Sequence, residues 1–275
     1  MIHTYRFESK ADSGAAAAVL GATAIKQAIE ARGCANVVVA TGSSQFDVLA
    51  SLTTDSSIDW SKVTAFHLDE YVGISASAKA SFRRYLRERF TEKLARLGAF
   101  HFIEGDAADI GGELGRLNDL LDRHPVDVAF AGIGENGHLA FNDPPADFVS
   151  TVGYQTVELD LTCRLQQVRE GWFPDLASVP LEAISMTVQR ILTSGVLVVA
   201  VSDERKADAV RNVLEGEVSN LCPASILQQH AACHLFLDAG AASGLSARRA
   251  AATTSSMPEP RQSGVQSVSR RPSIY

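Results

Sequence analysis

A glycine-rich stretch in the middle of the chain gathers polar side chains that could do acid–base chemistry. Segment 126–145 reads VDVAFAGIGENGHLAFNDPP, and two acids, two asparagines and a histidine follow the apolar run 126–131. Open α/β sheets display polar groups at the carboxyl ends of parallel strands, where they bind ligands. We therefore expect His138 to act as a general acid or base, with Asn136 and Asp143 beside it in the catalytic site. The alternative is a core histidine bonded to a backbone carbonyl.

A second cluster pairs two carboxylates at the end of another apolar run. Segment 66–73 reads FHLDEYVG and contains Asp69 and Glu70. Adjacent residues of a strand point to opposite faces, so only one of the two can enter a given pocket. We assign Asp69 as the catalytic base. Glu70 is expected beside the substrate or as an acid that binds nearby backbone, and a helix cap or surface salt bridge for both acids is the alternative.

A third segment, 40–45, has the composition of a phosphate-binding loop. It reads ATGSSQ and joins a strand to a helix, so backbone N–H groups, hydroxyls and a helix N-terminus would meet there. The candidate phosphate ligands in this loop are Thr41, Gly42, Ser43 and Ser44. Arg169 and Lys206 are the cations expected to converge on it. Lys206 lies in the first turn of a predicted helix, where the helix dipole disfavours a positive charge, and a cation held there often binds an anion. An ordinary serine N-cap is the alternative interpretation.

Neither a dinucleotide nor a metal is indicated by the spacing of the motifs. GIGENG at 132–137 fits GxGxxG, but Pro144 and Pro145 close the segment before a long helix could begin. A plain tight turn explains the glycines equally well, and we expect Gly137, beside the candidate histidine, among the substrate-binding residues. The remaining histidines and the four cysteines show no metal-ligand spacing.

Composition narrows the class of protein. The chain has 275 residues, of which 46% are hydrophobic and 21% charged, and a net charge of −7. These values are typical of a globular protein with a substantial core and argue against nucleic-acid binding, which needs a basic footprint. No secretory signal is visible and no apolar run is long enough for a membrane span, so we expect a cytoplasmic protein without a membrane partner. The sequence leaves open whether the protein forms a homo-oligomer.

Apolar strand-like runs alternate with helical runs along most of the chain. Strands are expected at 35–42, 63–71, 100–105, 126–134, 183–188, 196–202 and 233–240, with an antiparallel or edge strand at 154–162. Helices are expected at 12–32, 43–52, 81–98, 109–124 and 203–216. Continuous Val/Ile/Leu strands between helices indicate a mostly parallel, Rossmann-like α/β sheet covered on both faces, with a small antiparallel addition.

The chain is expected to form one domain, residues 1–240, followed by a tail. Residues 241–275 are rich in Ala, Ser, Thr, Pro and Arg and contain few large apolar side chains. Such a composition predicts a disordered segment.

In these motifs the chain resembles the glucosamine-6-phosphate deaminase family, in the superfamily shared with 6-phosphogluconolactonase. The likeness covers about residues 5–240 and is carried by TGSS, LDEYVG, GHLAFNDP, TCRLQQVR, the RKA after a strand and the late PASIL segment. The pair LDEYVG and GHLAFNDP is specific, since a lactonase would more often show GHxASLFP. Two departures are visible: the family usually has an acid at the position of Asn136 and a glutamate at that of Asp143.

The resemblance implies a cofactor-independent reaction in which glucosamine 6-phosphate and water give fructose 6-phosphate and ammonia. It implies that Asp69 moves a proton from C2 to C1, that His138 opens the sugar ring, and that the loop at 41–44 binds phosphate with Arg169 and Lys206. The partner would be a small hexosamine phosphate. Two alternatives remain: a related sugar-phosphate isomerase or lactonase, and a non-catalytic sugar-phosphate sensor.

Overall fold

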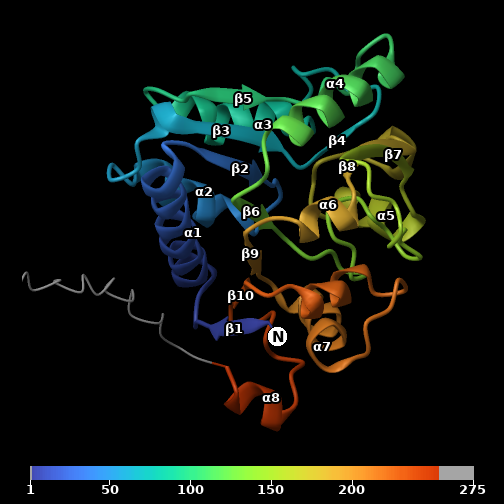
Figure 1. Cartoon of the computed structure of the whole chain (residues 1–275). Coiled ribbons are helices and arrows are strands. Elements are labelled where there is room, and N and C mark those ends of the chain that lie inside the picture. The colour runs from blue at the N-terminus through green and yellow to red at the C-terminus, as the bar shows by residue number, and fades with distance from the viewer. Residues whose placement is uncertain (1, 254–275) are drawn as a thin grey trace, which may run out of the picture.

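The computed structural model describes residues 2–253, which form two β-sheets surrounded by helices (Figure 1). The strands are β1 (His3–Arg6), β2 (Ala35–Val39), β3 (Val63–His67), β4 (Asp69–Tyr71), β5 (Ala99–His101), β6 (Val128–Ala131), β7 (Tyr154–Glu158), β8 (Glu182–Met186), β9 (Val196–Val201) and β10 (Cys233–Leu237). The α-helices are α1 (Lys10–Arg32), α2 (Gln45–Thr54), α3 (Phe82–Arg89), α4 (Ile110–Arg123), α5 (Leu161–Arg169), α6 (Val188–Leu192), α7 (Ala207–Glu215) and α8 (Ala247–Ala251).

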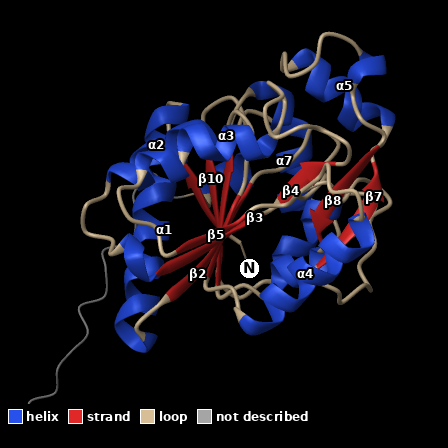
Figure 2. Ribbon diagram, turned by 90° about the horizontal axis from the view of Figure 1, so that it is seen from above, coloured by secondary structure: helices blue, strands red, loops and turns tan. Residues whose placement is uncertain are grey.

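The larger sheet has seven parallel strands in the order β1-β10-β9-β6-β2-β3-β5. Both of its faces are apolar, because alternate residues of each strand enter different cores: Val38 packs in one, Val37 and Val39 in the other. Helices α4, α6 and α7 cover the first face, and α1, α2 and α3 the second. Figure 2 shows α1 and α2 on one side of the strands and α4 on the other. The expected parallel α/β sheet is confirmed.

The smaller sheet is antiparallel, with the order β4-β8-β7, and includes the strand expected near 154–162. One prediction was wrong: segment 63–71 is not a single strand. The chain leaves the large sheet after His67 and begins β4 at Asp69, which pairs with Ser185 of β8. Leu68 bridges the two sheets, since its N–H donates to Val39 (3.1 Å) and its carbonyl accepts from Met186 (3.0 Å). A continuous apolar pattern does not reveal such a change of sheet.

Helix α1 shows how small residues bring a helix close to the sheet. Ser9 caps its start by accepting a hydrogen bond from the Asp12 N–H (3.1 Å), and Gly33 ends it with a left-handed φ of 82°. A Cβ at Gly21 would lie 2.3 Å from the ring of Phe130 in β6. Only glycine therefore allows α1 to pack this closely against β6, the strand that precedes the loop with His138.

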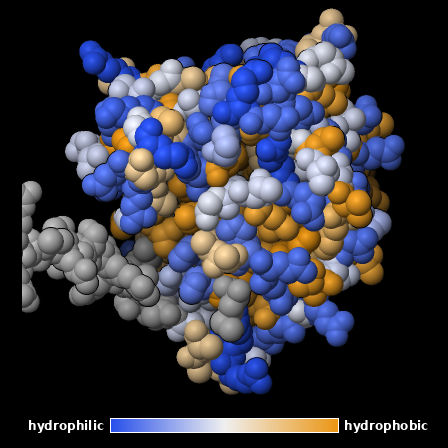
Figure 3. All heavy atoms as spheres, viewed as in Figure 1, coloured by the Kyte–Doolittle hydropathy of each residue, from blue (hydrophilic) through white to orange (hydrophobic). Residues whose placement is uncertain are grey.

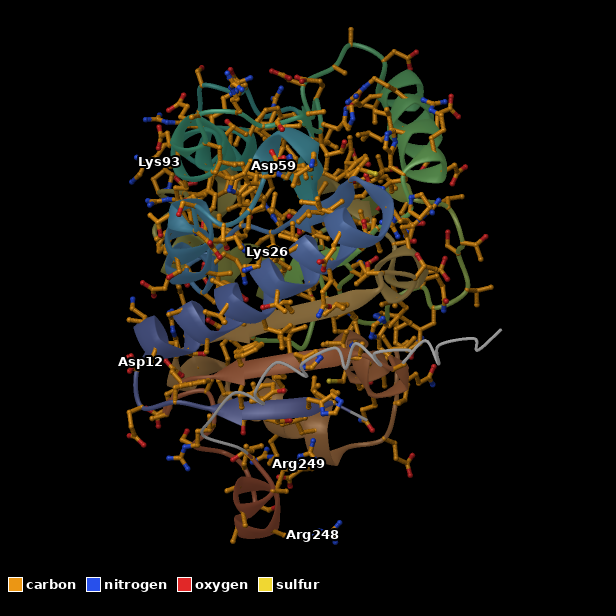
Figure 4. All side chains as sticks on the ribbon, turned by 60° about the vertical axis from the view of Figure 1, so that its left-hand side comes forward. Asp12, Lys26, Asp59, Lys93, Arg248 and Arg249 are labelled. Atoms are coloured by element: carbon orange, nitrogen blue, oxygen red, sulfur yellow. The ribbon has the colours of Figure 1, made fainter. Side chains whose placement is uncertain are left out.

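The boundary expected at residue 240 is not where the ordered structure ends. Ala241 and Ala242 are buried in the core, and the carboxylate of Asp238 accepts a hydrogen bond from the Ala241 N–H (2.7 Å). Farther on, Arg249 of α8 donates to Thr4 of β1 (3.4 Å), and Figure 4 shows it beside that strand. A segment with few large apolar residues can therefore still place its alanine side chains in the core. The rest of the predicted tail, 254–275, lies outside the described residues.

The surface gives two further observations. On the face drawn in Figure 3, hydrophilic residues cover most of the upper part and apolar residues gather in the middle. Within residues 2–253, no helix combines the length and apolar character that a membrane crossing requires.

Candidate active site

One pocket lies at the carboxyl ends of four neighbouring strands, β9, β6, β2 and β3. Seven of the residues predicted from sequence line it: Thr41, Gly42, Ser43, Ser44, Asp69, His138 and Lys206. The remaining five predicted site residues are not among its lining residues: Glu70, Asn136, Gly137, Asp143 and Arg169. The strands thus bring together four segments that lie far apart in the sequence, as the position of ligands in open α/β sheets leads one to expect.

The loop between β2 and α2 forms one wall of this pocket. Gly42 has a φ of 99°, which only glycine adopts without strain, and its carbonyl accepts a hydrogen bond from the Tyr85 hydroxyl (2.9 Å). Ser44 precedes the first residue of α2, and its side chain makes no capping hydrogen bond. The N–H groups of Gln45 and Phe46 already donate to the carbonyls of Gly42 (3.1 Å) and Ser43 (3.5 Å), so the donors for an anion in the pocket are those of the preceding loop at 41–44.

Asp69 lies in the pocket but is only 6% exposed. Burial, with a smaller contribution from the neighbouring charge of Glu70, raises the pKa of its carboxyl from 3.8 to about 8. A carboxyl with a pKa near neutrality can both accept and return a proton, as a general base in an isomerisation must.

Because of this raised pKa, we expect Asp69 to lower the stability of the protein as the pH rises. The native state keeps the proton up to about pH 8, whereas the unfolded chain loses it near pH 3.8. Between these values the native state binds more protons, so the free energy of unfolding falls by up to roughly 1.4 kcal/mol per pH unit. Asp69→Asn removes this dependence, and its stability advantage over the wild type should widen from pH 5 to pH 8 in urea denaturation.

The matched control for that measurement is Asp119→Asn, which changes an exposed aspartate of α4 by the same atoms. Its offset from the wild type should stay constant over the same pH range. A constant offset for Asp69→Asn as well would show that this carboxyl does not titrate as described.

Glu70 faces away from the pocket and organises the start of α3. Its carboxylate accepts hydrogen bonds from the N–H groups of Tyr71 (3.0 Å), Phe82 (3.1 Å) and Arg83 (2.8 Å) and from the Ser81 hydroxyl (2.9 Å). Burial still raises its pKa, although these donors oppose the shift. The structure therefore corrects its assignment as a substrate-binding residue and matches the alternative, an acid bound to nearby backbone.

His138 stands on a glycine turn and faces a carboxylate. Its Nδ1 lies 3.1 Å from Oδ1 of Asp143, a close electrostatic contact rather than an aligned hydrogen bond. Gly137 has a φ of 82°, and a Cβ at Gly134 would lie 2.2 Å from the imidazole ring, so both glycines are needed for the loop to fold around it. Gly137 thus shapes the loop and does not itself line the pocket.

The positions that depart from the family pattern are placed next to each other. The amide of Asn136 donates to Asp143 (3.0 Å) and to Asp160 (3.0 Å), and its carbonyl oxygen accepts from the backbone N–H of His138 (3.1 Å). Burial tends to raise the pKa of Asp143, but the imidazole, this amide and the Asp160 N–H (3.0 Å) hold it below its usual value. Asn136 thus acts through Asp143, which brings the negative charge to the imidazole.

The two predicted phosphate cations have different surroundings. Lys206 is buried at the pocket, and its Nζ lies 3.6 Å from Glu170, which also lines the pocket. Burial lowers the pKa of Lys206, against the opposing effect of Glu170. Arg169 instead has a half-exposed side chain paired with Glu135, away from the pocket lining. The structure therefore does not bring Arg169 to the site, because the acid at 135 holds it.

Seven polar or aromatic pocket residues were not predicted. Four come from α5 and the turn after it, and three from other segments: Gln166, Gln167, Glu170 and Trp172, then Phe82, Phe141 and Ser202. Glu170 accepts hydrogen bonds from Gln166 (2.8 Å) and from the indole of Trp172 (3.2 Å). The sequence indicates a short helical piece there, but its weak apolar pattern does not say which side faces a ligand.

Glu170 is expected to compete with an anionic ligand for Lys206. Glu170→Gln removes a carboxylate from the pocket while keeping the shape of the side chain, so KM for a sugar phosphate should fall by about tenfold, equivalent to roughly 1.4 kcal/mol. Steady-state kinetics would measure this, with kcat near the wild-type value. Glu204→Gln, which makes the same charge change at an exposed position two residues from Lys206, is the control. A KM that rises in Glu170→Gln would instead assign this carboxylate to the sugar.

Comparisons with known proteins agree with this geometry. Residues 8–236 match the family profile of glucosamine-6-phosphate isomerases/6-phosphogluconolactonase. A glucosamine-6-phosphate deaminase of Listeria monocytogenes serotype 4a (strain HCC23) is 35% identical over 205 residues, which cover 74% of this chain and 85% of that protein. The solved structure of a monomeric glucosamine-6-phosphate deaminase has a TM-score of 0.79 at 29% identity, covering 88% of this chain and all of that one.

A 6-phosphogluconolactonase of Shewanella baltica OS155 shares the fold at a lower similarity. Its TM-score is 0.70 at 20% identity, covering 86% of this chain and 97% of that one. The family resemblance inferred from the motifs is thereby confirmed. The chain belongs to the family of glucosamine-6-phosphate isomerases and 6-phosphogluconolactonases.

Proposed function

We propose that this protein is a glucosamine-6-phosphate deaminase, which converts glucosamine 6-phosphate and water to fructose 6-phosphate and ammonia without a cofactor. The observation that carries the proposal is a single pocket lined by Asp69, His138, Lys206 and the loop at 41–44. A base, a ring-opening imidazole and a phosphate site are the three parts that this reaction needs.

The phosphate end of the substrate binds between the loop and Lys206. The backbone N–H groups of the loop at 41–44 and the hydroxyls of Thr41, Ser43 and Ser44 offer donors, and the lysine supplies a positive charge. The phosphate displaces Glu170 from Lys206. A fixed phosphate also positions the reacting carbons at the other end of the sugar, which lowers the barrier by several kcal/mol.

His138 acts on the ring oxygen and the C1 hydroxyl of the closed sugar. It transfers a proton between them, so the C1–O bond of the ring breaks and an aldehyde forms. Asp143 lies 3.1 Å from Nδ1 and orients the imidazole for this transfer. The pair therefore serves the first step, and Asn136 keeps Asp143 in place.

Asp69 carries the isomerisation. It removes the proton at C2 of the open sugar, an enolamine forms, and the carboxyl then gives a proton to C1. While the carboxyl holds that proton, the proton can exchange with solvent. Water then adds to the imine at C2, and ammonia leaves. The amino group of the substrate is a cation next to the C2–H bond, so its arrival favours the ionised form of a carboxyl whose pKa is about 8 in the empty site.

The test is to incubate the purified chain with glucosamine 6-phosphate and to follow ammonia and fructose 6-phosphate with separate enzyme-coupled assays. We expect both products in equal amounts. Acid release from 6-phosphogluconolactone, measured in parallel, is the contrast. Acid release without ammonia would reassign the protein to the lactonase branch of the family, and binding of the sugar phosphate without either reaction would indicate a sensor.

A further inference from the structure

Three side chains of the kinds that bind transition metals meet behind the pocket. A ring nitrogen of His138, a carboxylate oxygen of Asp143 and Sγ of Cys163 all lie within 4.8 Å of one another. The first two come from the loop after β6, and Cys163 comes from the first turn of α5. No ligand spacing connects positions 138, 143 and 163 along the sequence, and only the fold brings them together.

The imidazole in this cluster has an unsatisfied nitrogen. His138 is only 9% exposed, and its Nδ1, which is buried, has no aligned hydrogen-bond partner although it faces Asp143 at 3.1 Å. A buried polar atom without a partner costs free energy, and such atoms in native structures often mark a ligand. Cys163 is fully buried with a free thiol, and the side chain of Asp143 is 5% exposed.

Groups around the cluster hold its members in place. Asp143 accepts hydrogen bonds from Asn136 (3.0 Å) on one oxygen and from the Asp160 N–H (3.0 Å) on the other. Asp160 in turn accepts a hydrogen bond from the Cys163 N–H (2.6 Å) and thus fixes the turn that carries the thiol. Such outer contacts orient ligands before a metal arrives and raise its affinity.

We propose that His138, Asp143 and Cys163 form a binding site for Zn²⁺. Imidazole nitrogen, carboxylate oxygen and thiolate sulfur are its usual protein ligands, whereas Mg²⁺ and Ca²⁺ prefer oxygen alone. The thiol loses its proton to solvent on binding, so a thiolate and a carboxylate neutralise the charge of the ion.

Metal binding at this site would switch off the histidine that opens the sugar ring. The ion takes the lone pair of Nδ1 and replaces the contact between the imidazole and Asp143. The positive charge of the ion then opposes the protonation of the imidazole ring that the ring-opening step requires. This consequence rests on the proposed function, and the metal site itself does not.

Binding is tested on the full chain with Co²⁺ as a spectroscopic substitute for Zn²⁺. One equivalent of Co²⁺ should give the thiolate-to-cobalt charge-transfer band and the strong visible bands of a tetrahedral site, and one equivalent of Zn²⁺ should abolish both. Cys163→Ser and Cys163→Ala should each lose the charge-transfer band. Cys222→Ser, which alters a half-buried thiol next to Gly137 but outside the cluster, should keep it.

The activity measurement uses the same proteins. Zn²⁺ should inhibit ammonia release by the wild type and Cys222→Ser, a chelator should reverse the inhibition, and Mg²⁺ should have no effect. In Cys163→Ser the Zn²⁺ concentration for half-inhibition should rise at least about tenfold, equivalent to roughly 1.4 kcal/mol. A stoichiometric cobalt spectrum in a protein that releases no ammonia would uphold the metal site and reject the deaminase function. Absence of the spectrum in the wild type, or its persistence in both Cys163 variants, would overturn the metal site.

Discussion

Asp69→Asn is expected to reduce kcat for ammonia release by about 10²- to 10⁴-fold, the usual contribution of a general base. The amide keeps the shape of the side chain but cannot accept the C2 proton. The phosphate site is formed by other segments, so the dissociation constant of fructose 6-phosphate should stay near the wild-type value. Loss of kcat without loss of binding is the pattern of a residue that acts in the transition state.

The most direct measurement for this variant is proton exchange in heavy water. Wild-type enzyme should exchange the C2 proton of glucosamine 6-phosphate and, with ammonia present, the C1 proton of fructose 6-phosphate, as seen by proton NMR. Asp69→Asn should exchange neither, while Asp119→Asn, on exposed α4, should behave as the wild type does. Normal exchange in Asp69→Asn would assign the base to another residue of the pocket.

Lys206→Ala is expected to raise KM for glucosamine 6-phosphate by about 10- to 100-fold, because a hydrogen bond to a charged group contributes roughly 1.5–3 kcal/mol. The side chain is buried at the pocket, where the charge of a phosphate is poorly screened by solvent. The preference for the sugar phosphate over unphosphorylated glucosamine, expressed as the ratio of their kcat/KM values, should fall as well. Glu170 would then face the phosphate without a cation beside it.

Steady-state kinetics with both sugars would test this expectation. The matched control is Arg205→Ala, which removes one positive charge at the preceding, exposed position, where Arg205 pairs with Asp203. Its KM should change little. Lys206→Arg should recover part of the affinity for the phosphate. An unchanged KM in Lys206→Ala would place the phosphate elsewhere in the pocket.

Much of the scaffold follows from apolar patterning, because buried parallel strands consist of almost nothing but Val, Ile, Leu and Ala. β2 and β9 are examples, and both end at the pocket. The passage from β3 to β4 was missed, since Leu68 and Asp69 continue the same apolar-then-acidic pattern whichever sheet they join. Ala241 and Ala242 were missed for the opposite reason, because composition reports the amount of apolar surface and not the space available to it.

The candidate site was predictable where residue type and strand end coincide, as for Asp69 and His138. It was not predictable where a side chain chooses between partners. Arg169 could have faced the pocket, but Glu135 lies within its reach and pairs with it. Glu170 was not predicted. It follows α5, a nine-residue helix with a weak apolar face, and nothing in that sequence shows that the end of α5 lies beside Lys206. Such choices depend on distances across the fold, which the sequence does not contain.

The backbone that carries Asp69 is fixed from two directions at Leu68, where the chain passes from the larger sheet to the smaller one. Main-chain hydrogen bonds tie Leu68 to Val39 on one side and to Met186 on the other. Backbone held in this way resists displacement. The carboxylate of Asp69 therefore keeps its position relative to both sheets at once, and with it the direction from which it approaches the C2–H bond. Accurate proton delivery thus depends on the place where the chain passes from one sheet to the other.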